Sequence, residues 1–157
     1  MPAGDKLISL FEPHADIIVK GRREVEYGHK VTLTTGRSGL ILDLAIEAGN
    51  PADSKRLLPM LERHIARYGK PPRQLAADGG FATTRNAASG SRNMVRSRWV
   101  YRQLRNFRAG IEADISCLKR AYGLARCTWR GLDHFRAYVW SAVVAYNLAL
   151  FARLQPT

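Results

Sequence analysis

The stretch LRNFRAGIEADISCLKRAYGLARCTWRG, residues 104–131, decides how we expect the chain to fold. A helical step of about 100° per residue stacks five apolar side chains into one stripe: Leu104, Ile111, Ile115, Leu118 and Tyr122. The same step gathers a second set on an adjoining polar face: Arg105, Arg108, Glu112, Ser116 and Lys119. One carboxylate thus lies among cations beside a face that must be buried. An ordinary solvated helix face has the same pattern, so spacing alone leaves both interpretations open.

The charge of the chain is strongly positive. Its formal net charge is +12, from 25 Lys or Arg and 13 Asp or Glu in 157 residues. Ten basic residues fall within 92–130, against only Glu112 and Asp114. Arginine binds phosphate oxygens through its forked guanidinium, so this concentration favours a nucleic-acid partner over a membrane surface. A basic surface without a specific ligand is the alternative.

Length and composition indicate one ordinary globular domain covering residues 1–157. Apolar residues make up 46% and charged residues 24% of the chain, which excludes a disordered chain. The two cysteines, Cys117 and Cys127, and the four histidines have neither disulfide-framework nor zinc-site spacing. With no signal-peptide pattern at the N-terminus, we expect a reducing, cytoplasmic location.

The first fifty residues have strand periodicity. Residues 7–13, 16–20, 29–35 and 40–49 have alternating or β-branched character, and GRREVEYG between the second and third is expected to form a turn. The glycine-containing link GRSG joins the last two runs as a hairpin. These features predict an antiparallel meander of two or three strands.

The remaining elements alternate helix and loop. A helix capped by Asn50 or Asp53 is expected to end at Gly69, and Pro59 requires either a restart or a kink. Residues 73–81 predict a short strand ending at Asp78, although a plain Asp-Gly turn is an equal alternative. Residues 82–98 predict a short helix and a loop. Long helices follow from about Trp99 and after Gly131, and the last of these is expected to be a core helix rather than a bilayer span.

Five stretches together resemble the C-terminal part of a DDE-type insertion-sequence transposase. They are SLFEPHADIIVKGR, VEYGHKVTL, GNPADS, LAADGGF and RAGIEADISCLKRAYGLARCTWRG, and the last is the most specific of them. The resemblance implies an RNase H-like fold of mixed α/β (α+β) class. It would combine the short antiparallel meander with one further strand and pack both with long helices.

The resemblance also implies DNA transposition, a form of DNA recombination, by metal-dependent strand cleavage and transfer. In that family three carboxylates hold two divalent ions, usually Mg²⁺ or alternatively Mn²⁺, and oxygen ligands suit such hard cations. The second and third acids correspond to Asp78 and Glu112 of this chain. Phosphate contacts are expected from six basic residues: Arg105, Arg108, Lys119, Arg120, Arg126 and Arg130.

Two departures from the family pattern bear on activity. The first acid of the triad has no evident match; Asp16 and Asp43 lie on or beside strands, but in stretches that the pattern uses otherwise, and Asp53 suits a helix cap better. The segment between Asp78 and Glu112 also lacks the usual further strand. We therefore expect a truncated, inactive copy whose unpaired sheet edge favours self-association into a homo-oligomer. A non-catalytic nucleic-acid-binding module that uses residues 92–130 is the alternative.

Overall fold

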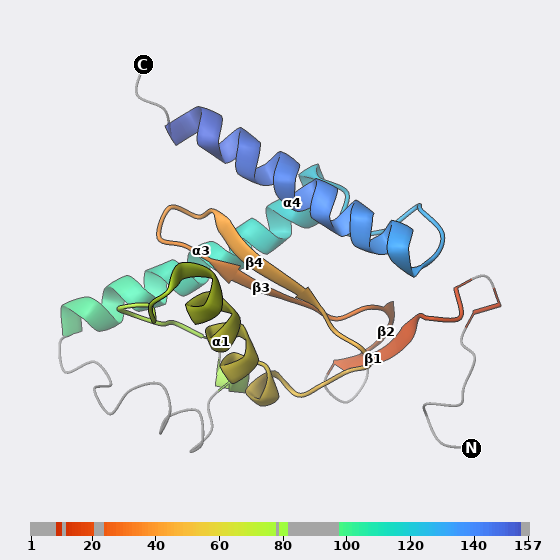
Figure 1. Cartoon of the computed structure of the whole chain (residues 1–157), viewed down its shortest axis with the longest axis horizontal. Coiled ribbons are helices and arrows are strands. Elements are labelled where there is room, and N and C mark those ends of the chain that lie inside the picture. The colour runs from red at the N-terminus through yellow and green to blue at the C-terminus, as the bar shows by residue number, and fades with distance from the viewer. Residues whose placement is uncertain (1–8, 11, 21–23, 78, 82–97, 155–157) are drawn as a thin grey trace. The chain divides into compact units, whose positions relative to one another are not determined.

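The structure, a computed structural model, describes residues 9–10, 12–20, 24–77, 79–81 and 98–154. Its regular elements are, in chain order, strands β1 (Asp16–Lys20), β2 (Glu24–Gly28), β3 (Val31–Thr35) and β4 (Ile41–Ile46), the 3₁₀ turn η2 (Asp53–Lys55), helix α1 (Leu57–Tyr68), the 3₁₀ turn η3 (Gly79–Phe81), and helices α3 (Arg98–Ala121) and α4 (Leu132–Leu154) (Figure 1). This combination is of the α+β class.

Strands β1 and β2 form an antiparallel pair. The register runs from Asp16 opposite Gly28 to Lys20 opposite Glu24. Ile18 is buried at 8% exposure, whereas Val19, Val25 and Tyr27 are about half exposed or more. The turn predicted over GRREVEYG is therefore wrong for residues 24–28. Glu24 and Glu26 alternate there with apolar Val25 and Tyr27, which is the period of a strand.

Strands β3 and β4 form a second two-stranded sheet. The Gly36 N–H donates to the Leu40 carbonyl at 2.8 Å, and the Glu47 N–H donates to the Lys30 carbonyl at 2.8 Å, which fixes an antiparallel hairpin. The predicted hairpin is confirmed, but the strands form two separate pairs rather than one meander.

Two predicted strands are not found in the described residues. Among residues 9, 10, 12 and 13 none is in a strand, and the Ala15 N–H donates to the Glu12 carbonyl in a turn instead. Residues 73–77 likewise form no strand. They follow Pro71 and Pro72, neither of which has an N–H for a strand ladder, and no strand in the described part of the chain pairs with them. The short helix predicted within 82–98 lies outside the described residues, except for its last position.

Helix α1 begins after the 3₁₀ turn η2 and contains Pro59 in its first turn, as the restart alternative predicted. Proline is tolerated there because the first N–H groups of a helix have no internal partner. Gly69 ends the helix in a left-handed conformation with φ 70°, and its N–H donates to the Ile65 carbonyl. No side chain caps the start of α1, so the predicted capping role of Asp53 is wrong.

The chain divides into two compact units, and each has its own buried residues. One unit contains residues 1–32, 46–50 and 117–157, and the other contains 33–45 and 51–116. The first buries Ile18, Leu118, Val139, Ala142, Val143 and Tyr146. The second buries Ile41, Leu44, Ala45 and Met60.

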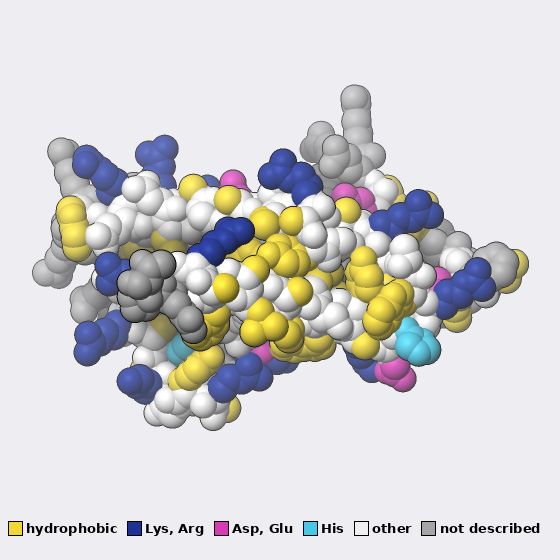
Figure 2. Space-filling model, turned by 90° about the horizontal axis from the view of Figure 1, so that it is seen from above, with side chains coloured by type: hydrophobic (Ala, Val, Ile, Leu, Met, Phe, Trp, Pro, Cys, Tyr) yellow, Lys and Arg dark blue, Asp and Glu magenta, His cyan; other side chains and the backbone are white. Residues whose placement is uncertain are grey.

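Helix α4 buries one face and exposes the other. Val139, Ala142, Val143 and Tyr146 are buried. Trp140, Val144, Leu148 and Phe151 are between 40% and 65% exposed, and Figure 2 shows apolar side chains at the surface of this part of the chain. By length and composition, the stretch Leu132–Arg153 also meets the criteria of a membrane span, which core helices of soluble proteins meet as well.

The end of α3 is set by Gly123. This glycine has φ +76°, and the Leu124 N–H donates back to the Leu118 carbonyl at 3.1 Å. A left-handed residue followed by such a bond closes the last turn of a helix. The Tyr138 hydroxyl donates to the Gly123 carbonyl at 2.9 Å and so ties α4 to this turn.

Alanine at Gly123 should lower the free energy of unfolding by about 1–2 kcal/mol, because it combines a left-handed backbone with a steric conflict. A Cβ atom at this position would lie 2.6 Å from the Tyr138 hydroxyl. Gly110, an exposed residue of α3, is the matched control, because a Cβ atom there would have no other atom within 4 Å. Gly110→Ala should stabilise by about 0.5–1 kcal/mol. Urea unfolding of both variants measures this, and equal effects of the same sign would contradict the assignment.

Candidate nucleic-acid interface and acidic site

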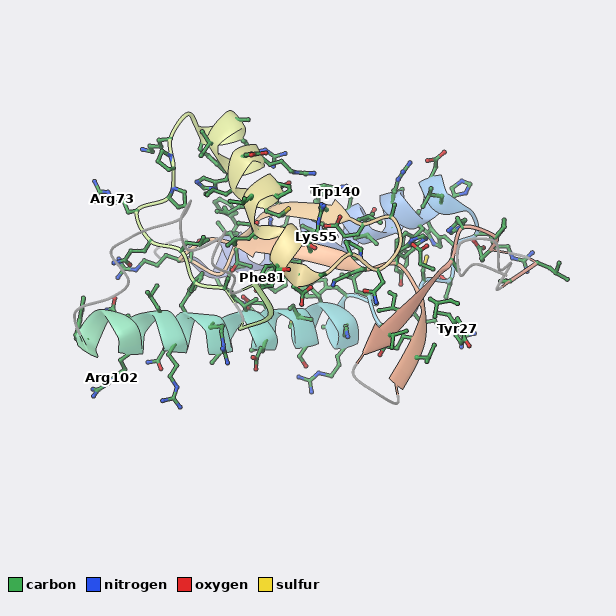
Figure 3. The ribbon with its side chains drawn as sticks, turned by 90° about the horizontal axis from the view of Figure 1, so that it is seen from below. Tyr27, Lys55, Arg73, Phe81, Arg102 and Trp140 are labelled. Carbon is green, nitrogen blue, oxygen red and sulfur yellow. The ribbon has the colours of Figure 1, made fainter. Side chains whose placement is uncertain are left out.

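Helix α3 has the two faces that its sequence predicts. Leu104, Ile111, Ile115 and Tyr122 are half-buried and Leu118 is 1% exposed, so the apolar stripe faces the protein. The predicted phosphate-binding residues on the helix are all exposed: Arg105, Arg108, Lys119 and Arg120. Arg102 is exposed as well and points away from the helix axis (Figure 3).

The loop between α3 and α4 carries the remaining predicted basic residues, Arg126 and Arg130, and both are exposed. Hydrogen bonds hold its backbone in place. The Tyr138 hydroxyl also approaches the Arg126 carbonyl at 3.3 Å, and the Gly131 N–H donates to the Glu12 carboxylate at 3.1 Å. The Trp129 ring packs edge-on against Tyr138 with ring centroids 5.6 Å apart. The arginines therefore extend from a loop of defined conformation.

The two predicted metal-binding acids are not both described. Glu112 is exposed on α3, on the same face as Arg105, Arg108 and Lys119. Asp78 lies outside the described residues. Within the described part of the chain, no three His, Cys, Asp or Glu residues are grouped so that they could hold a metal ion. One exposed carboxylate among cations is not a metal site by itself, so the described residues do not fit a divalent ion.

Asp43 is held by an arginine of α1. Its side chain is 5% exposed, and the Arg63 guanidinium donates to its two oxygens at 2.7 and 2.8 Å. Burial raises the pKa of Asp43. The hydrogen bonds from Arg63 and the Leu44 N–H, together with the charges of Arg63 and Arg67, lower it by more than burial raises it, so the net pKa is below its usual value. Both carboxylate oxygens are thus engaged in a structural ion pair.

Asp16 also has structural partners. Its carboxylate accepts a hydrogen bond from the Gly49 N–H at 2.8 Å and lies 3.3 Å from Nδ1 of His29. This contact fastens the start of β1 to the segment that follows β4.

Asp53 has a contact that the sequence did not indicate. A Cβ atom built on Gly80 would lie 3.0 Å from Oδ2 of Asp53, so this carboxylate lies directly beside the η3 turn. The turn begins one residue after Asp78. Any residue larger than glycine at position 80 would force the Asp53 carboxylate to shift, so the second glycine of LAADGGF has a packing role. The pair of glycines at 79 and 80 was visible in the sequence, but the sequence did not predict that Asp53, 27 positions before Gly80, would pack against them.

Comparison with protein families places the chain in a known family. Residues 17–148 match the family described as Transposase DDE domain. The chain belongs to this family. The match includes Asp78, Glu112 and all six predicted phosphate-binding residues, and it connects the chain with transposition and with DNA as substrate. Neither the curated proteins nor the solved structures give a match.

Proposed function

We propose that this transposase-family domain binds duplex DNA through the exposed basic face of α3 and the loop that follows. One observation supports this above the others: Arg105, Arg108, Lys119 and Arg120 are all exposed, while the adjoining apolar stripe of the same helix is half-buried or buried. From Arg105 to Lys119 the helix extends about 21 Å at 1.5 Å per residue. This length corresponds to about six base pairs of DNA at 3.4 Å each.

The proposed contacts are with phosphates rather than bases. Arginine forks and lysine ammonium groups bind phosphate oxygens without reading sequence. Release of the counterions condensed on DNA then drives association, which makes the affinity strongly dependent on salt. Arg126 and Arg130, exposed in the loop that follows α3, would provide further phosphate contacts.

We further propose that Asp78 and Glu112 are what this chain contributes to a divalent-metal site, and that the 157-residue chain alone is inactive in cleavage. A bound pair of ions would supply activation of the attacking oxygen and stabilisation of the leaving one. Two carboxylates offer fewer ligands than two hard cations require. Neither Asp16 nor Asp43 is free to complete the set without giving up the contacts described above.

Isothermal titration of Mn²⁺ tests the proposed incompleteness. We expect no saturable binding by the wild-type chain, because two acids are too few. The variants Asp78→Ala and Glu112→Gln should then behave like wild type. Asp114→Asn, two residues away and half-buried on α3, is the matched control. Saturable binding that is lost in both Asp78→Ala and Glu112→Gln but kept in Asp114→Asn would show instead that the two acids still converge on a metal.

The alternative function is a nucleic-acid-binding module that has no use for the acids. Both proposals predict DNA binding that survives Glu112→Gln. They differ in the effect of the metal: the module predicts that Mn²⁺ changes affinity equally in wild type and Glu112→Gln, whereas an acidic site, even a weak one, predicts a metal effect that depends on Glu112.

A further inference from the structure

The loop between α3 and α4 presents an aromatic ring between two exposed arginines. Trp129 is 48% exposed, and Arg126 and Arg130 lie three residues before it and one residue after it. From Lys119 to Arg130 the chain has four basic residues and no Asp or Glu. A single apolar side chain at a protein surface is ordinary, so the surroundings of this ring decide what it can bind.

Hydrogen bonds on both sides of the ring fix the backbone that carries it. The Cys127 thiol donates to the Trp129 carbonyl at 3.4 Å, and Nδ1 of His134 lies 2.8 Å from the Arg130 carbonyl. The Gly131 N–H, bonded to a carboxylate at 3.1 Å, fixes the next residue. Because the loop is held before any ligand arrives, a ligand that binds there avoids much of the ordering cost of association.

One aromatic neighbour orients the indole ring without enclosing it. The Tyr138 ring meets the Trp129 ring at 64°, with ring centroids 5.6 Å apart. Tyr138 is itself anchored, because its hydroxyl donates to the Gly123 carbonyl at 2.9 Å. In an edge-on pair, each ring covers at most one face of the other. With 48% of Trp129 exposed, a face of the indole is accessible to a planar ligand.

The charge around the ring decides which planar ligand fits. Arginines repel a cationic partner, and an aliphatic partner would desolvate their guanidinium groups without offering an acceptor. A nucleotide suits both features, since its base stacks on the indole and the phosphates beside it accept hydrogen bonds from arginine. Stacking on a side chain requires a base with a free face, and base pairs inside a duplex are covered on both faces. The ligand that fits is therefore an unpaired nucleotide.

We propose that Trp129 is a stacking platform for an unpaired base of single-stranded DNA, and that Arg126 and Arg130 bind the phosphates beside that base. The proposal rests on the DNA binding proposed above and adds a second form of DNA to it. Helix α3 contacts the backbone of a duplex, whereas the loop after it takes a single strand. Because every base has a π-face, the platform binds without regard to sequence.

Tryptophan fluorescence tests the proposal in the full chain with Trp99→Phe and Trp140→Phe, because Trp129 is then the only indole. The probes are a short oligothymidylate and an abasic oligonucleotide of equal length, which has the same phosphates without bases. We expect the oligothymidylate to quench Trp129 and to bind roughly tenfold more tightly than the abasic strand. Both affinities should fall with salt along the same slope, because the phosphate contacts are the same.

Substitution of the ring provides the matched comparison, measured by anisotropy of labelled oligonucleotides. Trp129→Leu should weaken binding of the oligothymidylate roughly tenfold and change binding of the abasic strand and of duplex DNA by less than about twofold. Trp129→Phe keeps an aromatic face and should recover part of the loss. Trp140→Leu is the control, because it removes an indole that is 40% exposed on α4, outside the basic stretch, and it should change none of the three affinities.

The outcomes separate the platform from the duplex contact of α3. Equal affinities for the oligothymidylate and the abasic strand, without quenching and with duplex still bound, would overturn the platform and leave the α3 contact in place. Quenching by the oligothymidylate without any duplex binding would support the platform and contradict the α3 contact. No binding of any of the three would contradict both. If Trp129→Leu does not fold, Trp129→Phe and the two oligonucleotides with the wild-type ring decide.

Discussion

A duplex DNA fragment should bind the double variant Arg105→Gln, Arg108→Gln about 60-fold more weakly than wild type at 0.1 M salt. Each phosphate contact contributes about 0.9 to the slope of log K against log salt, so two lost contacts change the slope by about 1.8. From 1 M salt, taken as the reference at which the two proteins bind equally, to 0.1 M salt is one decade, so the affinities differ by about 10^1.8 at 0.1 M. Both side chains are exposed on α3 and face the same side as Glu112. Fluorescence anisotropy between 0.05 and about 0.5 M salt measures both quantities.

A second double variant controls for net charge. Arg73→Gln, Arg153→Gln removes two exposed arginines that are not on α3, and it leaves the proposed face intact. We expect a loss of less than about threefold, because this variant keeps every proposed phosphate contact. Equal losses in the two double variants would mean that only the overall charge matters, and α3 would lose its status as the contact face.

Replacing Arg63 by methionine should lower the free energy of unfolding by about 3 kcal/mol at pH 7. The change leaves the 5% exposed Asp43 carboxylate buried without its main partner, and breaking a buried pair from one side typically costs about 3–5 kcal/mol. We take the lower end because the Arg63 side chain is itself 47% exposed, which weakens the pair by solvent screening. Urea unfolding provides the measurement.

Two further observations distinguish a lost partner from lost packing. The double variant Asp43→Leu, Arg63→Met should recover most of the stability, since an apolar pair of similar volume replaces a buried ion pair at little cost. The pKa of Asp43 lies below its usual value in the wild type, so this carboxylate stabilises the fold above about pH 4 and ceases to do so as pH falls through its folded pKa. The deficit of Arg63→Met should accordingly shrink in acid. A deficit that persists in the double variant would contradict this explanation.

Local periodicity predicted the helices well. In α3, four apolar residues at helical spacing face the protein and the arginines beside them are exposed, because a 24-residue helix without proline must bury its apolar stripe. In α1, Pro59 and Gly69 set the start and the end through backbone conformation alone. These features depend on neighbours within one or two turns, so the sequence contains the information.

Strand pairing was predicted less well because it depends on distant partners. Residues 24–28 alternate charged and apolar side chains, yet the flanking glycines and arginines favoured a turn; pairing with β1 makes them a strand. Residues 73–77 look like a strand but lack a partner among the described residues. Isolated β-propensity is weak evidence for the same reason.

The sequence did not predict which side chains the acidic residues and histidines contact. Asp43 meets Arg63 across 20 positions and His14 meets His29 across 15. Each residue alone is an ordinary strand or turn residue, and only the fold brings the partners together. The predicted roles of Asp78 and Glu112 came from family resemblance, which the family match supports without testing these two residues.

The most direct test of the account is incubation of the purified chain with supercoiled plasmid and Mg²⁺ or Mn²⁺, followed by separate measurement of bound and nicked DNA. We predict that the plasmid is bound in a salt-sensitive manner, that binding weakens in Arg105→Gln, Arg108→Gln, and that no nicking occurs. Metal-dependent nicking by wild type that Asp78→Ala and Glu112→Gln abolish would contradict the account, because it would show a complete catalytic site in this chain or its oligomer.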